Sequence, residues 1–464
     1  MNDMKRKMYF GITLLLAFSL ALTACAQAAA EEPAAAEPES AQPAAEEPVK
    51  IGVYSVAWSP SSINMIQELI KKFNTEHEGK IVAEFVQGDW DGAENYITAG
   101  VAGGGGIADV MEYEVNGAYS WYQQGFTTDL SPYITDEVKA TMPEELWTAR
   151  TADDGSIFMS GTVTGSYLLI YYNPKALEAA GIALPAEGEV WTWQQFMDNA
   201  KLMTVDANGK HLGEAGFDAG SVVQWGFMPR LDNEKIWEEG SLYAMQATGQ
   251  PLIRKGDDGE WDIFFDDAAK DALKYYLSVI KESITPQEAI GLTGSSQDEA
   301  FYQGQAAMVE RDVFNVAVLH DNYPDFKFGV MTIPMDTVNT YFQDPTNGQG
   351  FVIPVTSEHP AEAAEFVFWM QKPENQAMWS KSLTMSPVNT KAMEDPLIAD
   401  NPDFVAMKFY KGIEKFVESE ICPNQDEFVT TLFAPTMMEV LMGNTSLDDA
   451  VTLIKATSKD ILNQ

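Results

Sequence analysis

An alternation of strand-like and helix-like segments between residues 49 and 124 constrains the fold of this chain more than any other feature. The segment from Lys50 to Trp58 is rich in β-branched and aromatic residues, and apolar residues then recur at helical spacing from Ile63 to Phe73. The same pair repeats twice, with predicted strands at 80–87 and 107–114 and predicted helices at 90–102 and 117–124. This alternation predicts a parallel sheet covered by helices, with functional side chains in the loops at the carboxyl ends of the strands.

The loops at these predicted strand ends carry aromatic, acidic and amide side chains. In chain order they are Trp58, Asp89, Trp90, Tyr113, Glu114 and Asn116. Each residue alone is as compatible with the core or a solvated surface as with a function. Their recurrence at equivalent places in three successive units favours one binding edge.

The first 24 residues have the layout of a secretory signal peptide. Lys5, Arg6 and Lys7 precede an uncharged apolar stretch from Met8 to Leu22. This stretch has about 15 residues, fewer than the roughly 20 that a membrane-spanning helix needs. No other run in the chain approaches that length, so we expect the mature chain not to be a channel or a permease.

The segment Leu22-Thr23-Ala24-Cys25 resembles the lipobox of bacterial lipoproteins, in which the cysteine receives a diacylglyceryl group and becomes the first mature residue. The resemblance implies a protein that is exported and lipid-anchored to the outer face of the cytoplasmic membrane, at the cell surface or in the periplasm. Two acyl chains on one residue suffice for stable anchoring. The alternative is an ordinary signal peptide cut near Ala24 or Ala30, with an incidental cysteine.

The composition changes sharply after the cysteine. Residues 25–48 are almost wholly Ala, Glu, Pro, Gln and Ser, which predicts a disordered acidic tether. From Val49 to Gln464 the chain is long enough for two or three domains of about 150 residues. The only cysteine besides Cys25 is Cys422, which we expect to be a buried or lone thiol. No disulfide is therefore expected within the mature chain, and the fold must rest on its core.

The net charge of −40 argues against nucleic acid and anionic lipid as partners, because both would be repelled. Such acidity favours solubility or a salty habitat over the attraction of a cationic ligand. The four histidines lie far apart and none is paired with a carboxylate or cysteine at ligand spacing, so neither a metal site nor a cofactor is expected. The segment from Asp206 to Gly209 predicts a turn rather than a truncated calcium loop.

Several short motifs follow one another in a fixed order after Val49. They are Phe73-Asn74, the glycine-containing passage 99–109, Gly125–Tyr133, Tyr171–Lys175 with Ala180-Gly181 and Trp191–Trp193, Phe301–Met308, Phe328–Pro334 and Ala363–Val367. In this order they resemble the motifs of family 1 extracellular solute-binding proteins, the family that includes maltose-binding protein. The resemblance implies an α/β chain with the two-lobed periplasmic-binding-protein fold, type II-like. Each lobe is then a mixed sheet flanked by helices, and hinge segments join the lobes.

The same resemblance implies the division of the chain and its function. The N-terminal lobe is expected at 49–162 plus 330–371 and the C-terminal lobe at 163–329 plus 372–464, with crossings near 160–164, 328–333 and 371–379. A monomeric receptor of an ABC transporter is implied, which captures a carbohydrate, expected to be an oligosaccharide, between its lobes. It then delivers this solute to a membrane permease. Solute binding shifts the open–closed equilibrium only by its difference in affinity for the two states.

A sugar site needs aromatic plates for the CH face and fixed polar groups for the hydroxyls. The expected aromatic residues are Trp58, Trp90, Tyr113, Trp225, Trp237 and Trp379. The expected polar residues are Asp89, Glu114, Asn116, Arg311, Gln343 and Asn347. Arg311 lies where many relatives carry a Gly-Pro-Trp type segment. Because this cation could bind an anionic group, a non-sugar or charged solute is the alternative.

Enzymatic activity is the alternative from another functional class, and we do not expect it. Ser278 and Lys281 match the S-x-x-K pattern of penicillin-binding enzymes, but the companion S-D-N and K-T-G elements are missing. No sequence motif identifies a pair of carboxylates for glycoside cleavage. Because the chain has many acidic residues, a carbohydrate-active enzyme is still an alternative. A surface adhesin with the same lobes is a third alternative.

Overall fold

The computed structural model describes residues 47–165, 168–186, 189–336, 341–346, 348–406, 414–417 and 419–464. The chain divides into a unit of residues Met1–Glu46 and a compact unit of residues Glu47–Gln464. The predicted signal peptide, Cys25 and all but the last two residues of the predicted tether lie outside the described residues. None of the described helices is long and apolar enough to cross a membrane.

The first sheet of the compact unit contains the three predicted strand–helix pairs, which are confirmed. They are β1 (Val49–Ser55), α1 (Pro60–Glu76), β2 (Ile81–Gln87), α2 (Trp90–Gly103), β3 (Val110–Glu114) and α3 (Val115–Gln123). With β4 (Val163–Thr164) and β13 (Gly348–Val352), the strand order is β2-β1-β3-β13-β4. Strand β1 is parallel to β2 and β3, whereas β13 is antiparallel to β3 and β4. The sheet is therefore mixed.

Successive side chains of each strand point to opposite faces of this sheet, and both faces are buried. Val53 belongs to the apolar core that also includes the buried side of α1, whereas Tyr54 belongs to a second core with Trp121. Helix α1 begins at a capping box in which Ser59 and Ser62 exchange side-chain hydrogen bonds. Its apolar stripe ends at Phe73, which is fully buried, so replacing this ring by alanine should cost about 3–5 kcal/mol.

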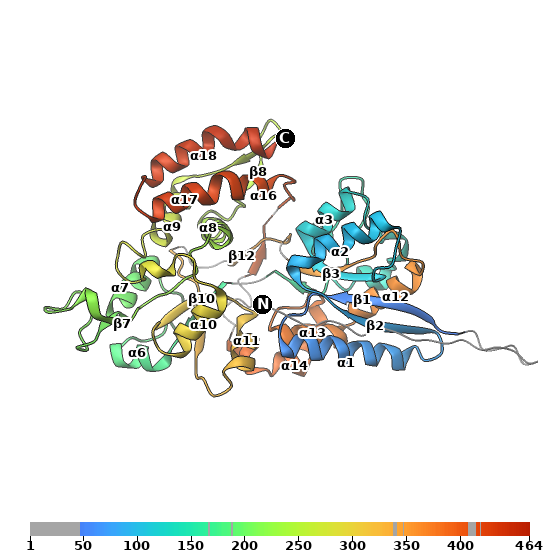
Figure 1. Cartoon of the computed structure of the whole chain (residues 1–464), viewed down its shortest axis with the longest axis horizontal. Coiled ribbons are helices and arrows are strands. Elements are labelled where there is room, and N and C mark those ends of the chain that lie inside the picture. Colours follow the sequence, from blue (N-terminus) through green and yellow to red (C-terminus); the bar gives the residue numbers. More distant parts are fainter. Residues whose placement is uncertain are drawn as a thin grey trace, which may run out of the picture. The chain divides into compact units, whose positions relative to one another are not determined.

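The second sheet has β5 (Leu168–Tyr172) at its centre. Strands β10 (Met308–Asp312) and β11 (Gly329–Thr332) both pair with β5 in the antiparallel direction. Figure 1 shows this sheet and the first sheet in different halves of the compact unit. Helices α8 (Asn233–Thr248) and α9 (Asp267–Tyr276) pack on each other beside β10, with the rings of Tyr243 and Tyr276 5.3 Å apart.

The remaining elements surround these two sheets. The α-helices are α4 (Asp136–Lys139), α5 (Glu144–Thr148), α6 (Pro174–Ala180), α7 (Trp193–Met203), α10 (Gly294–Tyr302), α11 (Asn315–Asn322), α12 (Pro360–Met370), α13 (Pro373–Leu383), α14 (Pro396–Ala399), α15 (Pro402–Ala406), α16 (Gln425–Phe428), α17 (Ala434–Leu441) and α18 (Leu447–Leu462). The strands are β6 (Val205–Asp206), β7 (Val222–Gln224), β8 (Ile253–Lys255), β9 (Trp261–Ile263), β12 (Tyr341–Gln343) and β14 (Glu414–Phe416). The 3-10 helices are η1 (Ser131–Tyr133), η2 (Ala219–Ser221), η3 (Gln287–Ala289) and η4 (Thr390–Glu394), and η5 (Val429–Phe433) is a π-helix.

Pairing and packing differ from the expected lobe boundaries at two places. Strand β11, expected from residue 330 in the N-terminal lobe, pairs with β5 of the second sheet. Helix α13, expected in the C-terminal lobe, packs on α1 beside the first sheet (Figure 1), where Lys72 Nζ donates to Asn375 Oδ1 at 2.5 Å. Strand β11 thus pairs with the second sheet and α13 packs beside the first, and the lobe boundaries stay a prediction.

Candidate functional site

Three aromatic rings meet at the carboxyl ends of β1, β2 and β3. The ring centroids of Trp58 and Trp90 are 6.1 Å apart, and those of Trp90 and Tyr113 are 5.4 Å apart. All three side chains are half-buried. Tyr113 also stacks at 4.3 Å on Trp121, whose ring is fully buried in the core. We call Trp58, Trp90 and Tyr113 the aromatic cluster, and the stacking on Trp121 anchors it to the sheet.

The second sheet contributes one ring to the edge of this cluster. Phe314, two residues after the end of β10, contacts Trp58 edge-on at 5.3 Å. The sequence prediction did not include Phe314 among the site residues. Its position just after a strand end was the only signal, and the partner ring lies more than 250 positions away in the sequence. The aromatic cluster therefore touches elements of both sheets.

The two predicted carboxylates beside the cluster cap the helices that follow them. Asp89 Oδ1 accepts a hydrogen bond from the backbone N–H of Gly92 at 2.7 Å, at the start of α2. The Glu114 carboxylate accepts the backbone N–H groups of Asn116, at 2.6 Å, and of Gly117, at the start of α3. Both carboxylates thus satisfy helix N–H groups, and this holds them beside the rings.

Burial raises the pKa of the Glu114 carboxyl to about 7, although the N–H groups of Gly117 and Asn116 act against this rise. The carboxylate of Asp426, from α16, adds a smaller upward contribution to the pKa. Burial likewise raises the pKa of Tyr113 to about 12, with Glu114 as the next cause. The sequence prediction missed Asp426, which the fold brings into electrostatic range of Glu114 from a distant part of the chain.

Arg311 lies in a different environment from the one expected. Its guanidinium donates to Gln297 Oε1 at 3.1 Å and to Asn315 Oδ1 at 2.8 Å, and it lies 3.7 Å from Asp298 Oδ2. Asn315 Nδ2 in turn donates to Asp298 Oδ1 at 3.0 Å. The side chain of Arg311 is only 12% exposed. The hydrogen bonds and the charge of Arg311 therefore serve an internal network, and its role in ligand binding stays a prediction.

Trp379 is fully buried in the core, and its role as a ligand residue stays a prediction. Trp225 is half-buried, and its backbone N–H donates to Gln305 O at 2.8 Å. Trp237 packs edge-on against Phe433 at a ring distance of 4.9 Å.

The last three predicted residues have different outcomes. Asn116 is exposed, and only its backbone N–H takes part in the cap formed by Glu114. Gln343 lies in β12 with 7% of its surface exposed. Asn347 lies outside the described residues. The structure thus brings together Trp58, Asp89, Trp90, Tyr113 and Glu114.

The described part of the chain holds no group of three or more His, Cys, Asp or Glu side chains that could bind a metal ion. Asp206 forms the predicted turn: Oδ1 accepts the backbone N–H of Asn208 at 2.8 Å and of Lys210 at 2.9 Å. Cys422 is a buried free thiol, as predicted.

Comparisons with known proteins agree with this architecture. Residues 68–406 match the profile of the family described as bacterial extracellular solute-binding protein. An uncharacterized lipoprotein of Streptomyces antibioticus is 22% identical over 355 residues, which cover 76% of this chain and 73% of that protein. The sn-glycerol-3-phosphate-binding periplasmic protein of Pectobacterium atrosepticum is 23% identical over 345 residues, which cover 71% of each chain.

Among solved structures, the GacH receptor of Streptomyces glaucescens, whose structure is known unliganded and with acarbose, superposes with a TM-score of 0.70. It is 19% identical, and the match covers 90% of this chain and 100% of that one. At this identity the likeness establishes the fold. It confirms the two-lobed α/β fold expected from the sequence.

Proposed function

Since the chain belongs to the bacterial extracellular solute-binding protein family, we propose that it is the receptor of an ABC importer and binds a carbohydrate at the aromatic cluster. The observation that carries this proposal is the row of rings formed by Trp58, Trp90 and Tyr113. Half-buried rings offer flat apolar faces, which suit the CH face of a pyranose. Asp89 and Glu114 stand beside these faces and are held by helix caps, so they suit the hydroxyl groups.

The charges around the cluster favour a neutral solute over a phosphorylated one. The Pectobacterium relative is named for sn-glycerol-3-phosphate, and a phosphate group requires cationic or N–H donors. Here Arg311 lies 3.7 Å from Asp298 Oδ2, and the residues next to Trp90 and Tyr113 in the sequence, Asp89 and Glu114, carry carboxyls. The acarbose complex of the Streptomyces glaucescens receptor supports a carbohydrate ligand. We therefore propose an oligosaccharide and keep a charged solute as the second candidate.

Transport requires that the solute favour a closed arrangement of the lobes. Trp58 precedes α1 beside the first sheet and Phe314 follows β10 of the second, and their rings are in contact. A solute that packs on Trp58 and reaches the side of Phe314 would gain contacts from both sheets only when they are close together. We propose that the permease recognises this closed form, that the receptor acts as a monomer, and that it leaves the solute chemically unchanged.

Attachment to the membrane through Cys25 completes the proposal. The relative from Streptomyces antibioticus is named a lipoprotein, which supports a lipid anchor after the signal peptide. Labelling cells with a radioactive fatty acid should label the wild-type protein. Cys25→Ser should remove the label and release the receptor from the membrane fraction. A labelled Cys25→Ser variant would contradict the anchor.

A thermal-shift screen tests the ligand class, because a solute that binds only the folded state raises the melting temperature. The screen should include maltotriose, other oligosaccharides, glycerol phosphate and amino acids. We expect oligosaccharides to stabilise the protein, Trp58→Ala to abolish the shift, and Trp261→Ala, in the β8–β9 hairpin, to preserve it. Stabilisation by amino acids or glycerol phosphate alone would refute the carbohydrate assignment. Recovery of a cleaved oligosaccharide would refute the binding-only role.

A further inference from the structure

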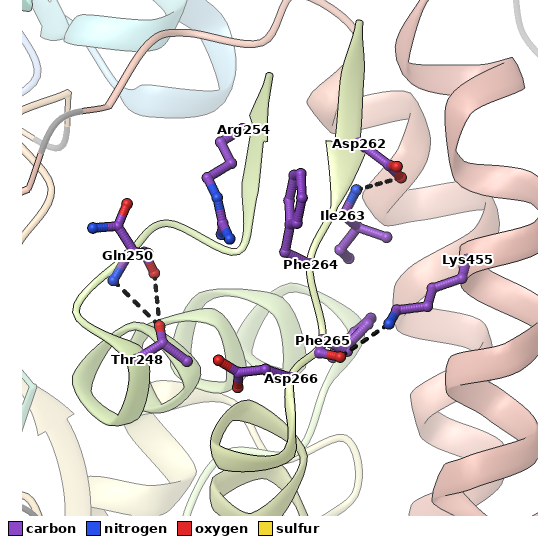
Figure 2. A pocket seen from close by; sticks show the side chains of 9 residues that line it. All are labelled: Thr248, Gln250, Arg254, Asp262, Ile263, Phe264, Phe265, Asp266 and Lys455. Carbon is purple, nitrogen blue, oxygen red and sulfur yellow. Dashed lines mark hydrogen bonds between the residues drawn. The ribbon is translucent and has the colours of Figure 1, made fainter. Parts of the chain in front are cut away.

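A cavity of about 360 Å³ lies in the part of the chain that contains the β8–β9 hairpin, and it shares no residue with the aromatic cluster (Figure 2). The end of α8, the two hairpin strands, the residues leading into α9 and one turn of α18 form its wall. The lining residues are Thr248, Gln250, Arg254, Asp262, Ile263, Phe264, Phe265, Asp266 and Lys455. Its volume lies in the range that small-molecule sites occupy.

Two cations line this cavity from different elements. The Arg254 guanidinium lies 3.8 Å above the ring centre of Phe264, and Figure 2 shows the two side chains next to each other, Arg254 on β8 and Phe264 just after β9. Its Nη1 donates to the carbonyl of Pro251 at 2.7 Å. Lys455 reaches from α18, and its Nζ donates to the carbonyl of Phe265 at 2.9 Å. These fixed contacts hold both cations at the wall, and neither contact involves a carboxylate.

The two carboxylates of the wall have other partners. Asp266 Oδ1 accepts the backbone N–H of Ala269 at 2.8 Å and caps α9. Asp262 Oδ1 accepts the hydroxyl of Ser458 at 3.2 Å, and its Oδ2 lies 3.6 Å from Lys459 Nζ. The negative charges are therefore directed at a helix terminus and at a neighbouring lysine. The lining thus holds two cations and two carboxylates, and the hydrogen bonds of Arg254 and Lys455 go to backbone carbonyls, while Asp266 acts on Arg254 electrostatically.

The other lining groups restrict the chemistry of an occupant. Phe264 and Ile263 contribute apolar surface, whereas Thr248 and Gln250 contribute a hydroxyl and an amide at the opposite wall. Burial lowers the pKa of Arg254, and Asp266 acts against that shift. A bound anion would compensate this desolvation.

We propose that this cavity is a second ligand site, which binds an organic carboxylate of monosaccharide size, a sugar acid, between Arg254 and Lys455. The carboxylate accepts hydrogen bonds from both cations, and the carbon skeleton packs on Phe264. The hydroxyl groups face Thr248 and Gln250. The site is independent of the solute proposed for the aromatic cluster.

Isothermal titration of the mature protein with glucuronate tests the proposal. We expect measurable binding of glucuronate, no binding of glucose, and weaker binding of inorganic phosphate. Lys455→Met and Arg254→Met should each weaken glucuronate binding at least tenfold. The control is Lys274→Met, an exposed lysine of α9 outside the cavity lining, which should change affinity less than twofold.

Titration of the Trp90→Ala variant separates the two sites. Glucuronate affinity should stay unchanged in this variant, whereas oligosaccharide binding should fall. Absence of glucuronate binding would refute the second site and leave the proposed function standing. Equal effects of Lys455→Met and Lys274→Met, or equal affinity for phosphate and glucuronate, would refute a site for sugar acids. Because Lys455 is exposed, its replacement should not unfold the protein, and the thermal melt of the unliganded variant checks this.

Discussion

The strand ends of the first sheet and the end of β10 in the second sheet carry similar residue types but use them differently. After β1, β2 and β3, three rings remain half-buried, and the carboxylates of Asp89 and Glu114 are bound by backbone N–H groups. In β10, three consecutive charged side chains all have side-chain partners. Glu310 accepts from the Tyr243 hydroxyl, Arg311 pairs with Asp298, and Asp312 lies 3.4 Å from Lys235 Nζ.

This difference shows why a polar residue at a strand end is only a candidate for ligand binding. A side chain capped by backbone N–H groups keeps lone pairs for a solute, and a half-buried ring keeps an open face. A charged side chain that is paired with a neighbouring opposite charge binds a solute poorly, because breaking the pair leaves the other charge buried and unpaired. We therefore expect the first sheet to provide most of the affinity and β10 to provide stability.

The largest effect is expected from Arg311→Met. This change leaves Asp298 buried without its cation, so the free energy of unfolding should fall by about 3–5 kcal/mol. Urea denaturation measures this loss. The double variant Arg311→Met with Asp298→Asn should recover part of it. Unchanged stability together with lost solute binding would reverse the roles that we assign to the two sheets.

A buried carboxyl in the first sheet gives the next largest effect. Burial raises the pKa of Glu112 from the ordinary 4.5 to about 7, against the hydrogen bond from Ser55. Between these values the folded state keeps a proton that the unfolded state has lost, so this contribution to stability is present below pH 4.5 and is lost as pH rises through 7. The loss is about 3 kcal/mol.

Glu112→Gln should remove its part of this pH dependence, because an amide does not titrate, whereas the part that comes from Glu114 stays. The measurement is the free energy of unfolding at several pH values, with Ser55→Ala as a control that retains the titration. Parallel pH curves for Glu112→Gln and wild type would show that folding does not raise the pKa of Glu112.

A smaller effect is expected on solute binding, where we compare variants of one aromatic residue from each sheet. Trp90→Ala should weaken solute binding about 30-fold, or about 2 kcal/mol, because a central aromatic plate is lost. Trp225→Ala, on the side of the second sheet, should change the affinity much less. Titration with the solute found by the thermal-shift screen measures both. A larger loss for Trp225→Ala would contradict the assignment of the site to the first sheet.

The smallest effect is expected at Asp89, where two variants separate the capping of α2 from solute binding. Asp89→Ala removes the cap of α2 and should cost about 1 kcal/mol of stability, whereas asparagine caps equally well. Asp89→Asn should therefore keep the stability and test the carboxylate in binding alone. Equal stability of the alanine and asparagine variants would show that the cap is unimportant.

The helices, strands and turns could be predicted from the sequence because they depend on residues that are neighbours in the chain. The three strand–helix pairs and the turn at Asp206 follow from residues close together in sequence. The positions of Trp58, Trp90 and Tyr113 at strand ends followed in the same way, since parallel strands end at one edge. The distances between their rings could not be predicted from the sequence.

The sequence by itself thus determined the α/β architecture and which residue types stand at the strand ends. Only the tertiary structure decided that Arg311 pairs with Asp298, that Phe314 meets Trp58, and that Asp426 approaches Glu114. It also decided that β11 pairs with β5 and that α13 packs on α1. The physical reason is that secondary structure follows short-range periodicity, whereas the partner of a charge or a ring is set by segments far apart in the chain.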